Sequence, residues 1–153
     1  MVIIGERGLS GFVKSMLDLI LATGAMMLLT LPFNLKYCFD NYVWTAGEYY
    51  WFLLFFLEIT GVLELALVFE LRKTFYQINK NEPFVDATAA SFKKIAVLAL
   101  LISAVYVVKI IWYPSFLTIF LTVAFIIFGL SGLVYSEIFR QAVRFKEEND
   151  LTI

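Results

Sequence analysis

The sequence predicts an all-α membrane protein, with four transmembrane helices in a single domain and cytosolic helical extensions. Two observations predict this class: 61% of the residues are hydrophobic, and they gather in four long runs separated by short polar stretches. Soluble domains are only about half apolar. Each run has about the 20 residues that a helix needs to cross roughly 30 Å of hydrocarbon. The predicted spans are residues 15–35, 50–71, 95–112 and 116–139.

The basic residues predict the orientation of these spans. Four crossings bring both ends of the chain to one side, and short loops rich in Lys and Arg stay in the cytoplasm. Of the twelve basic residues, only Lys36 and Lys109 fall on the other side. The remaining ten lie on the side of the termini: Arg7, Lys14, Arg72, Lys73, Lys80, Lys93, Lys94, Arg140, Arg144 and Lys146. We therefore expect both termini to be cytoplasmic.

The first run is expected to be a retained membrane helix and not a cleaved signal. A secretory apolar region has about 7–15 residues and ends at a cleavage site made of small residues. The run here is longer, contains Asp18 and leaves the membrane around Pro32. The segment Gly5–Lys14 before it is predicted to lie at the membrane interface.

The outer loop is predicted to run from Phe33 to Tyr49 and to be aromatic rather than charged. Trp51 and, across the other outer turn, Trp112 continue the aromatic band. Because such rings prefer the headgroup level, we expect an interfacial belt, with an aromatic cage for a ligand as the alternative. Cys38 lies in this loop and, as the single cysteine, has no partner for an intramolecular disulfide.

The second run is predicted to continue as a helix beyond the membrane, because apolar residues recur there at helical spacing. Pro83 ends this helix, since proline cannot join the hydrogen-bond ladder. Asp86 can cap a new helix that leads into the third span. The sequence therefore predicts a cytosolic helical hairpin over residues 72–94, with Phe84 at its turn, and a cytosolic tail over residues 140–153.

The third and fourth spans are predicted to be antiparallel neighbours in a four-helix bundle. Only the turn Trp112–Ser115 joins them, and so short a connection forces the helices side by side. Gly132 and Ser136 form a small-xxx-small pair that allows close helix approach. This pattern is common in membrane helices and indicates packing rather than function. The sequence is also compatible with a homo-oligomer.

Four ionisable residues inside the spans are candidate polar sites, because burying a charge in a bilayer costs about 2.5–3.5 kcal/mol on insertion scales. They are Asp18, Glu58, Glu64 and Lys109. At about 1.5 Å per residue, Glu58 lies roughly 12 Å and Lys109 roughly 4 Å below the outer boundary, so the two could pair. Alternatively, Lys109 extends to the interface while Glu58 is protonated or bonded to Tyr106. Asp18 could approach the basic hairpin.

These carboxylates could bind a proton, a cation or an amine, or they could be hydrogen-bonded contacts between helices, which we favour. Glu64 lies near the middle of the membrane and has no obvious cationic partner. Glu70 and Glu137 are expected to be solvated at the inner boundary.

No sequence pattern indicates catalysis, a cofactor or a metal site. Histidine is absent, which excludes imidazole ligation of haem, the usual zinc sites and histidine-based nucleophile pairs. The sequence also lacks a phosphate-binding loop, a dinucleotide glycine pattern and a nucleophile elbow. Proteins that bind nucleic acid carry an excess of basic residues, and the net charge of this chain is −1. We expect a protein that is not an enzyme, needs no cofactor and does not bind nucleic acid directly.

Two cytosolic segments resemble the bacterial four-span family known as domain of unknown function 2975. One is Leu71–Phe84 followed by Ser91–Ala96, and the other is the end of the chain, Glu137–Val143 and Lys146–Ile153. Glu82 departs from the plainer turn of many relatives. The resemblance covers essentially the whole chain and implies a protein of the bacterial cell membrane without an established activity. Members of the family often sit beside a small helix-turn-helix regulator of the Cro/C1 type.

We expect a regulatory or interaction protein that rests in the lipid bilayer and docks a cytosolic partner such as that regulator. The candidate docking residues are Phe75, Tyr76, Pro83, Phe84, Phe92, Leu151 and Ile153. Alternatively, the aromatic residues of this set pack against one another and the membrane surface. The second functional class is a small transporter, or an immunity or resistance protein, that uses the intramembrane carboxylates. Four spans are few for a transporter, which would need a dimer.

Overall fold

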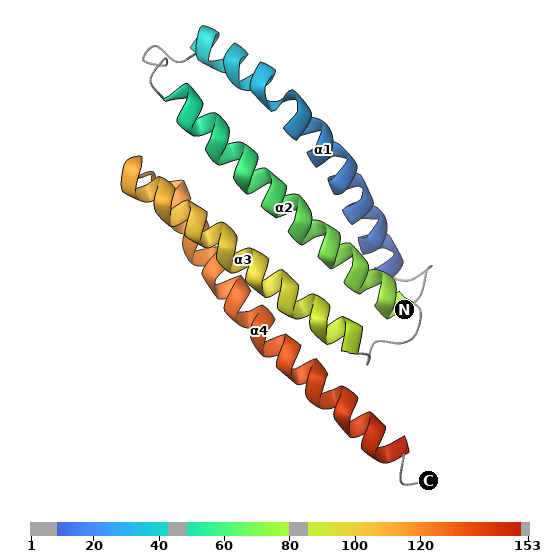
Figure 1. The fold of residues 1–153 in the computed structure, drawn as a ribbon. Coiled ribbons are helices and arrows are strands. Elements are labelled where there is room, and N and C mark those ends of the chain that lie inside the picture. Colours follow the sequence, from blue (N-terminus) through green and yellow to red (C-terminus); the bar gives the residue numbers. More distant parts are fainter. Residues whose placement is uncertain (1–8, 43–48, 80–85, 151–153) are drawn as a thin grey trace.

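The computed structural model describes residues 9–42, 49–79 and 86–150, which form four α-helices (Figure 1). Their bounds are Leu9–Tyr42 for α1, Tyr50–Asn79 for α2, Asp86–Trp112 for α3 and Phe116–Asp150 for α4. All four helices are long and apolar enough to cross a membrane, as the sequence predicts. The chain runs up and down, so the start of α1 and the end of α4 lie toward the same end of the molecule.

The helices form an open row and not the closed four-helix bundle expected from the sequence. α1 packs on α2, α2 on α3 and α3 on α4, whereas the described parts of α1 and α4 do not touch (Figure 1). Leu29 of α1 is 78% exposed and Phe116 of α4 is 88% exposed. Lipid tails solvate such faces as well as another helix would, so no hydrophobic force closes the row.

α3 is the most buried of the four helices. α2 also has a neighbour on each side, but the contact of α3 with α4 is the most extensive in the row. Its buried residues Ile95, Ala99, Ile102 and Tyr106 recur every three or four positions and therefore share one face. Leu67 of α2 completes this core. Partly buried side chains of α2, α3 and α4 pack around it: Phe56, Leu63, Leu71, Leu98, Leu121 and Phe125.

Glycines allow the close approach of α1 and α2. Leu65 of α2 fills the space beside Gly24 of α1, where an added Cβ would lie 2.7 Å from its Cδ2 atom. Leu28 of α1 fills the space beside Gly61 of α2 in the same way. Each helix thus supplies one leucine and one glycine to the seam, which lets the two backbones come close.

The small-xxx-small pair predicted on the fourth span does lie at a helix contact. An added Cβ on Gly132 would lie 3.0 Å from the Cβ atom of Ala96 in α3. One turn later, Ser136 donates a hydrogen bond of 2.9 Å to the carbonyl oxygen of Ala89. The pair therefore joins α3 to α4, as expected.

The predicted outer loop is wrong over its first part, because residues 33–42 continue α1 as a helix. Pro32 lies inside this helix and does not end it. Proline frees the carbonyl oxygen one turn earlier, here that of Leu28, and membrane helices tolerate this loss where other groups satisfy the freed oxygen. The Pro32 carbonyl itself accepts a hydrogen bond of 3.2 Å from the Tyr50 hydroxyl of α2, and the Tyr50 ring packs edge-on against Phe39. Cys38 is therefore an exposed residue of a helix.

The second and fourth helices extend beyond their predicted spans, as expected. α2 continues to Asn79 and α4 continues to Asp150, while α3 begins at Asp86 as the sequence predicts. The predicted hairpin turn at Pro83 and Phe84 lies outside the described residues.

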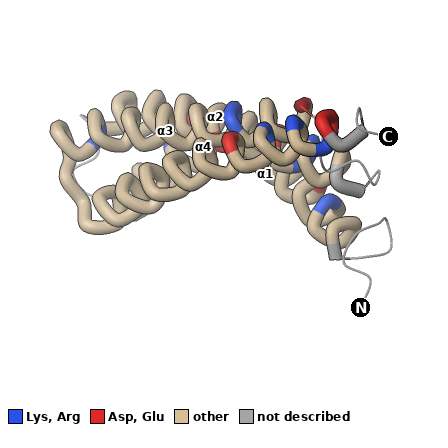
Figure 2. The backbone as a smooth tube through the Cα atoms, turned by 90° about the horizontal axis from the view of Figure 1, so that it is seen from below, with Lys and Arg blue, Asp and Glu red and all other residues tan. Residues whose placement is uncertain are grey.

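The charged residues are distributed unevenly along the row. Viewed from below, Lys, Arg, Asp and Glu gather toward the end that carries both chain ends, and the opposite end is almost free of them (Figure 2). This end also carries the extensions of α2 and α4. We call it the inner end.

Candidate functional site

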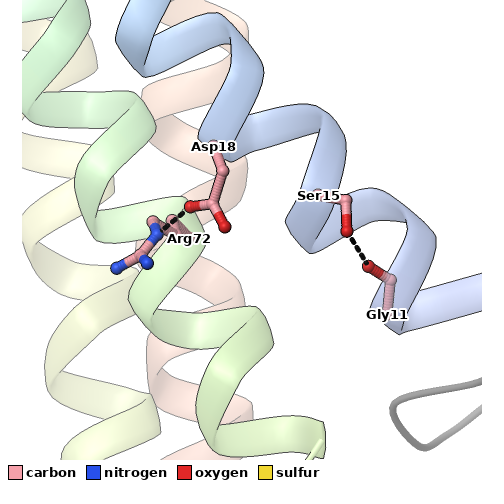
Figure 3. Close-up of polar contacts among 4 residues, drawn as sticks. All are labelled: Gly11, Ser15, Asp18 and Arg72. Carbon is pink, nitrogen blue, oxygen red and sulfur yellow. Dashed lines mark hydrogen bonds and ion pairs between the residues drawn. The ribbon is translucent and has the colours of Figure 1, made fainter.

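Asp18 is held by Arg72 across the seam between α1 and α2 (Figure 3). The Nε atom of Arg72 donates to the Oδ1 atom of Asp18, and both side chains are partly exposed. Nearby, the Nζ atom of Lys14 lies 5.1 Å from the ring centroid of Tyr76. The expectation that Asp18 approaches the basic hairpin is thus confirmed, since Arg72 is its first residue. Asp18 acts here as a contact between helices.

Glu64 is bonded to a tyrosine of the next helix. The Tyr106 hydroxyl of α3 donates a hydrogen bond of 2.9 Å to the Oε1 atom of Glu64 in α2. Tyr106 is held in place by rings on both sides, Phe56 of α2 at 5.5 Å and Phe125 of α4 at 5.7 Å between centroids. Within the described residues, no basic side chain forms an ion pair with Glu64.

Glu64 and Tyr106 line a cavity of about 330 Å³ between α1 and α2. The rest of the wall is almost entirely apolar: Ile20, Gly24, Met27, Leu28, Leu31, Leu57, Thr60, Gly61, Leu65 and Val68. Thr60 turns its hydroxyl to the Phe56 carbonyl oxygen of its own helix at 2.8 Å. The carboxylate and the phenol are therefore the polar groups that face the space. We call this the Glu64 cavity.

The pair between Glu58 and Lys109, considered from the sequence, does not form. The Nζ atom of Lys109 donates to the Ser115 hydroxyl at 2.9 Å and to the Thr118 hydroxyl at 2.7 Å. Tyr106 bonds Glu64 and not Glu58. Lys109 bonds these hydroxyls because the tight turn before α4 brings Ser115 and Thr118 beside it. Lys109 thus bonds the turn between α3 and α4.

Glu70 is less solvated than the sequence suggested. Only 14% of its side chain is exposed, and its Oε1 atom lies 3.6 Å from the Nζ atom of Lys94 in α3. Its Oε2 atom is buried without a hydrogen-bond partner among the described residues. Both residues line a groove of about 590 Å³ between α2 and α3, together with Ala66, Phe69, Ala90, Lys93, Val97 and Leu98. Sequence reasoning missed Glu70 because depth along a helix does not reveal which neighbour covers a side chain.

A second groove, of about 410 Å³, lies between the inner parts of α3 and α4. It carries charges of both signs from each helix: Asp86 and Lys93 of α3, Glu137 and Arg140 of α4. Within it, the Nη2 atom of Arg140 lies 2.6 Å from the Oε2 atom of Glu137. Ala89, Ala90, Leu133 and Ser136 form the remainder of the wall. We call this the inner groove.

The described docking candidates differ in accessibility. Phe92 is stacked on Phe139 of α4, with 4.9 Å between centroids, and therefore joins α3 to α4. Phe75 is partly buried, and Tyr76 is exposed. The other candidates lie outside the described residues: Pro83, Phe84, Leu151 and Ile153. Phe92 thus packs on a residue outside the candidate set rather than on the other candidates.

A metal centre is not evident in the part of the chain that the structure describes. No group of three or more Cys, Asp or Glu residues in these segments comes close enough together to hold an ion.

Residues 39–153 match the family described as "Protein of unknown function (DUF2975)". The chain belongs to this family. The resemblance predicted from the sequence is therefore confirmed, although the matched region is shorter than the whole chain. No curated protein and no solved structure is significantly similar to the chain.

The DUF2975 match covers α2, α3 and α4 completely but includes only the last turn of α1. Glu64, Tyr106 and the inner groove thus belong to the matched region. Asp18 and the α1 wall of the Glu64 cavity precede it.

Proposed function

We propose that this DUF2975 protein is a multi-pass protein of the bacterial cell membrane that docks a cytosolic partner at its inner end. A small helix-turn-helix regulator, the neighbour that the family resemblance suggests, is the partner we favour. In this orientation the chain ends face the cytosol and the Trp112 turn faces outward. The bias of basic residues toward the inner end supports it, because positively charged loops are retained in the cytoplasm.

The observation that carries the proposal is the inner groove. Two helices hold it rigidly, because the Phe92–Phe139 stack and the Ser136–Ala89 bond join them. Its Lys93 and Arg140 are exposed, so water and a soluble partner can reach them. Charges of both signs on a rigid surface fix the orientation of a protein partner and exclude wrong ones.

The extension of α4 also carries an exposed apolar side chain beyond this groove. Phe145 is 65% exposed and lies beyond the predicted membrane span, where lipid tails would not cover it. Aromatic side chains often contribute most to the affinity of an interface. The sequence reasoning did not single out Phe145, although an aromatic residue between Arg144 and Lys146 was a visible signal.

A pull-down from detergent tests this proposal, with full-length protein as bait and a small helix-turn-helix regulator of the Cro/C1 type as prey. K93E/R140E reverses both basic charges of the inner groove and should weaken capture by about tenfold or more. K73E is the matched control, because Lys73 is an exposed basic residue of α2 outside the groove. Equal capture by wild type and K93E/R140E would exclude the groove as the docking surface.

Truncation after Lys146 tests the contribution of the tail. The shortened protein should still insert in the membrane but lose its effect on the regulator, since the acidic and apolar end would be absent. A truncated protein that regulates normally would rule the tail out.

A second candidate function, a small transporter or an immunity or resistance protein, is favoured by one observation. Glu64 faces a cavity and has no cationic partner among the described residues. A proton- or toxin-dependent phenotype that E64Q abolishes would support this function over docking.

A further inference from the structure

We infer that the Glu64 cavity is a binding site for a small hydrophobic amine in its protonated form. This inference does not depend on the docking function. Three features of the cavity carry it: an accessible carboxylate, a tyrosine that fixes this carboxylate, and an apolar wall that opens toward the outer face of α1.

The carboxylate is oriented but not neutralised. Tyr106 bonds its Oε1 atom, and within the described chain no hydrogen bond is made to Oε2. Among the described residues, Glu70 Oε2 is the fully buried side-chain oxygen without a partner, so the unbonded Glu64 Oε2 atom is at least partly exposed. Glu64 contrasts with Asp18 and Glu70, which have Arg72 and Lys94 beside them. An ionised Glu64 in hydrocarbon therefore needs a cation from outside the described residues.

The composition of the wall selects the kind of cation. A metal ion needs several oxygen ligands, usually six or more for Ca²⁺ and Mg²⁺, and the cavity offers one carboxylate and one phenol. An anion would be repelled by the carboxylate. A proton would neutralise Glu64 but leave the apolar space unfilled. A protonated amine with a short hydrocarbon chain satisfies both parts, because its ammonium group pairs with Glu64 and its chain fills the apolar space.

The cavity size and access fit a small ligand. A volume of about 330 Å³ lies at the lower end of the range for small-molecule sites, roughly 300–1,000 Å³. Met27, at the rim, is 68% exposed on α1. In a bilayer this side of α1 faces lipid, so an amphiphile could enter laterally.

Thermal unfolding of the full-length protein in detergent tests the inference with octylamine as the probe. Octylamine is protonated at neutral pH, and octanol is the matched uncharged probe. At ten times its Kd, octylamine should raise the Tm of the wild type by about 3–6 °C. E64Q should lose this rise, whereas E58Q should retain it, because Glu58 lies on the same helix but does not line the cavity. An equal rise with octanol, or an unchanged rise in E64Q, would overturn the inference.

Chemical protection provides a second readout that needs no variant. Dicyclohexylcarbodiimide modifies carboxyl groups in apolar surroundings, and mass spectrometry measures the modified fraction at each residue. N,N-Dimethyloctylamine is the probe here, because a tertiary amine is protonated at neutral pH but cannot form an amide with the activated carboxyl group. It should slow modification of Glu64 at least threefold, about the protection expected when most sites are occupied. Modification of Glu58 should not change. Equal protection of the two residues, or none at Glu64, would show that the amine does not occupy the Glu64 cavity.

Discussion

Asp18 and Arg72 form an ion pair across the seam of α1 and α2, although they lie 54 positions apart in the sequence. The pair closes the inner end of this seam, and the reciprocal leucine–glycine contacts close its middle. At the outer end, Tyr50 bonds the Pro32 carbonyl oxygen. α1 touches no other described helix, so its contacts with α2 alone hold it in the row of described helices.

Removal of the Asp18–Arg72 pair should weaken the attachment of α1. D18N and R72Q should each lower the free energy of unfolding by about 0.5–1 kcal/mol, because the pair is partly exposed. The double variant should lose less free energy of unfolding than the sum of the two single losses, since either change alone already breaks the pair. Unfolding in mixed detergent measures these values, and K73Q, a change of an adjacent exposed basic residue, is the control. Strict additivity would contradict a direct interaction.

Alanine at Gly132 should destabilise the protein more than alanine at Gly24. The new methyl group at Gly132 would press on the Cβ and backbone atoms of Ala96, which cannot rotate away. We expect a loss of about 1–3 kcal/mol for this overpacking. At Gly24 the methyl group meets the end of the Leu65 side chain, which can move. Both changes gain the same helix propensity, so the difference in Tm reports packing. S131A on the exposed face of α4 is the control, and the reverse order would refute this explanation.

Loss of the Thr118 hydroxyl should destabilise the outer turn through Lys109. T118V removes the shorter of the two hydrogen bonds to the ammonium group, 2.7 Å long, and should cost about 1.5–3 kcal/mol. T122V is the matched control, because the Thr122 hydroxyl bonds only the carbonyl oxygen of Thr118 in its own helix. In a K109M background the cost of T118V should fall. An unchanged cost there would mean that Lys109 is not the relevant partner.

Cys38 should react with a membrane-impermeant thiol reagent in intact cells. It is exposed near the outer end of α1, on the side opposite to the inner end. A C38S/R144C variant should react only after the membrane is permeabilised, because residue 144 lies on the inner extension of α4. The opposite pattern, with Cys38 labelled only after lysis, would invert the proposed orientation.

Several local features were predictable because the sequence encodes them directly. The boundaries of α2, α3 and α4 at Tyr50, Asp86, Trp112 and Phe116 follow from hydrophobicity, the tight turn and an acidic residue that can cap a helix. The contact of Gly132 and Ser136 with α3 follows from residue size. The end of the first helix was not predictable from Pro32, because a membrane helix can continue past a proline that would end a helix in water. The Tyr50 hydroxyl that bonds the Pro32 carbonyl comes from another helix, so the local sequence does not reveal this contact.

The sequence by itself determined the number of helices, their up-and-down path and the concentration of charge at one end, because length, hydrophobicity and basic residues act locally. Only the tertiary structure decided that the row stays open, that Lys109 bonds hydroxyls and not Glu58, and that Glu70 is largely covered by α3. It also decided that Glu64 meets Tyr106 beside a cavity. These outcomes depend on how each helix is rotated about its own axis. Side-chain packing between neighbouring helices fixes this rotation, and a sequence that is apolar on every face gives little sign of it.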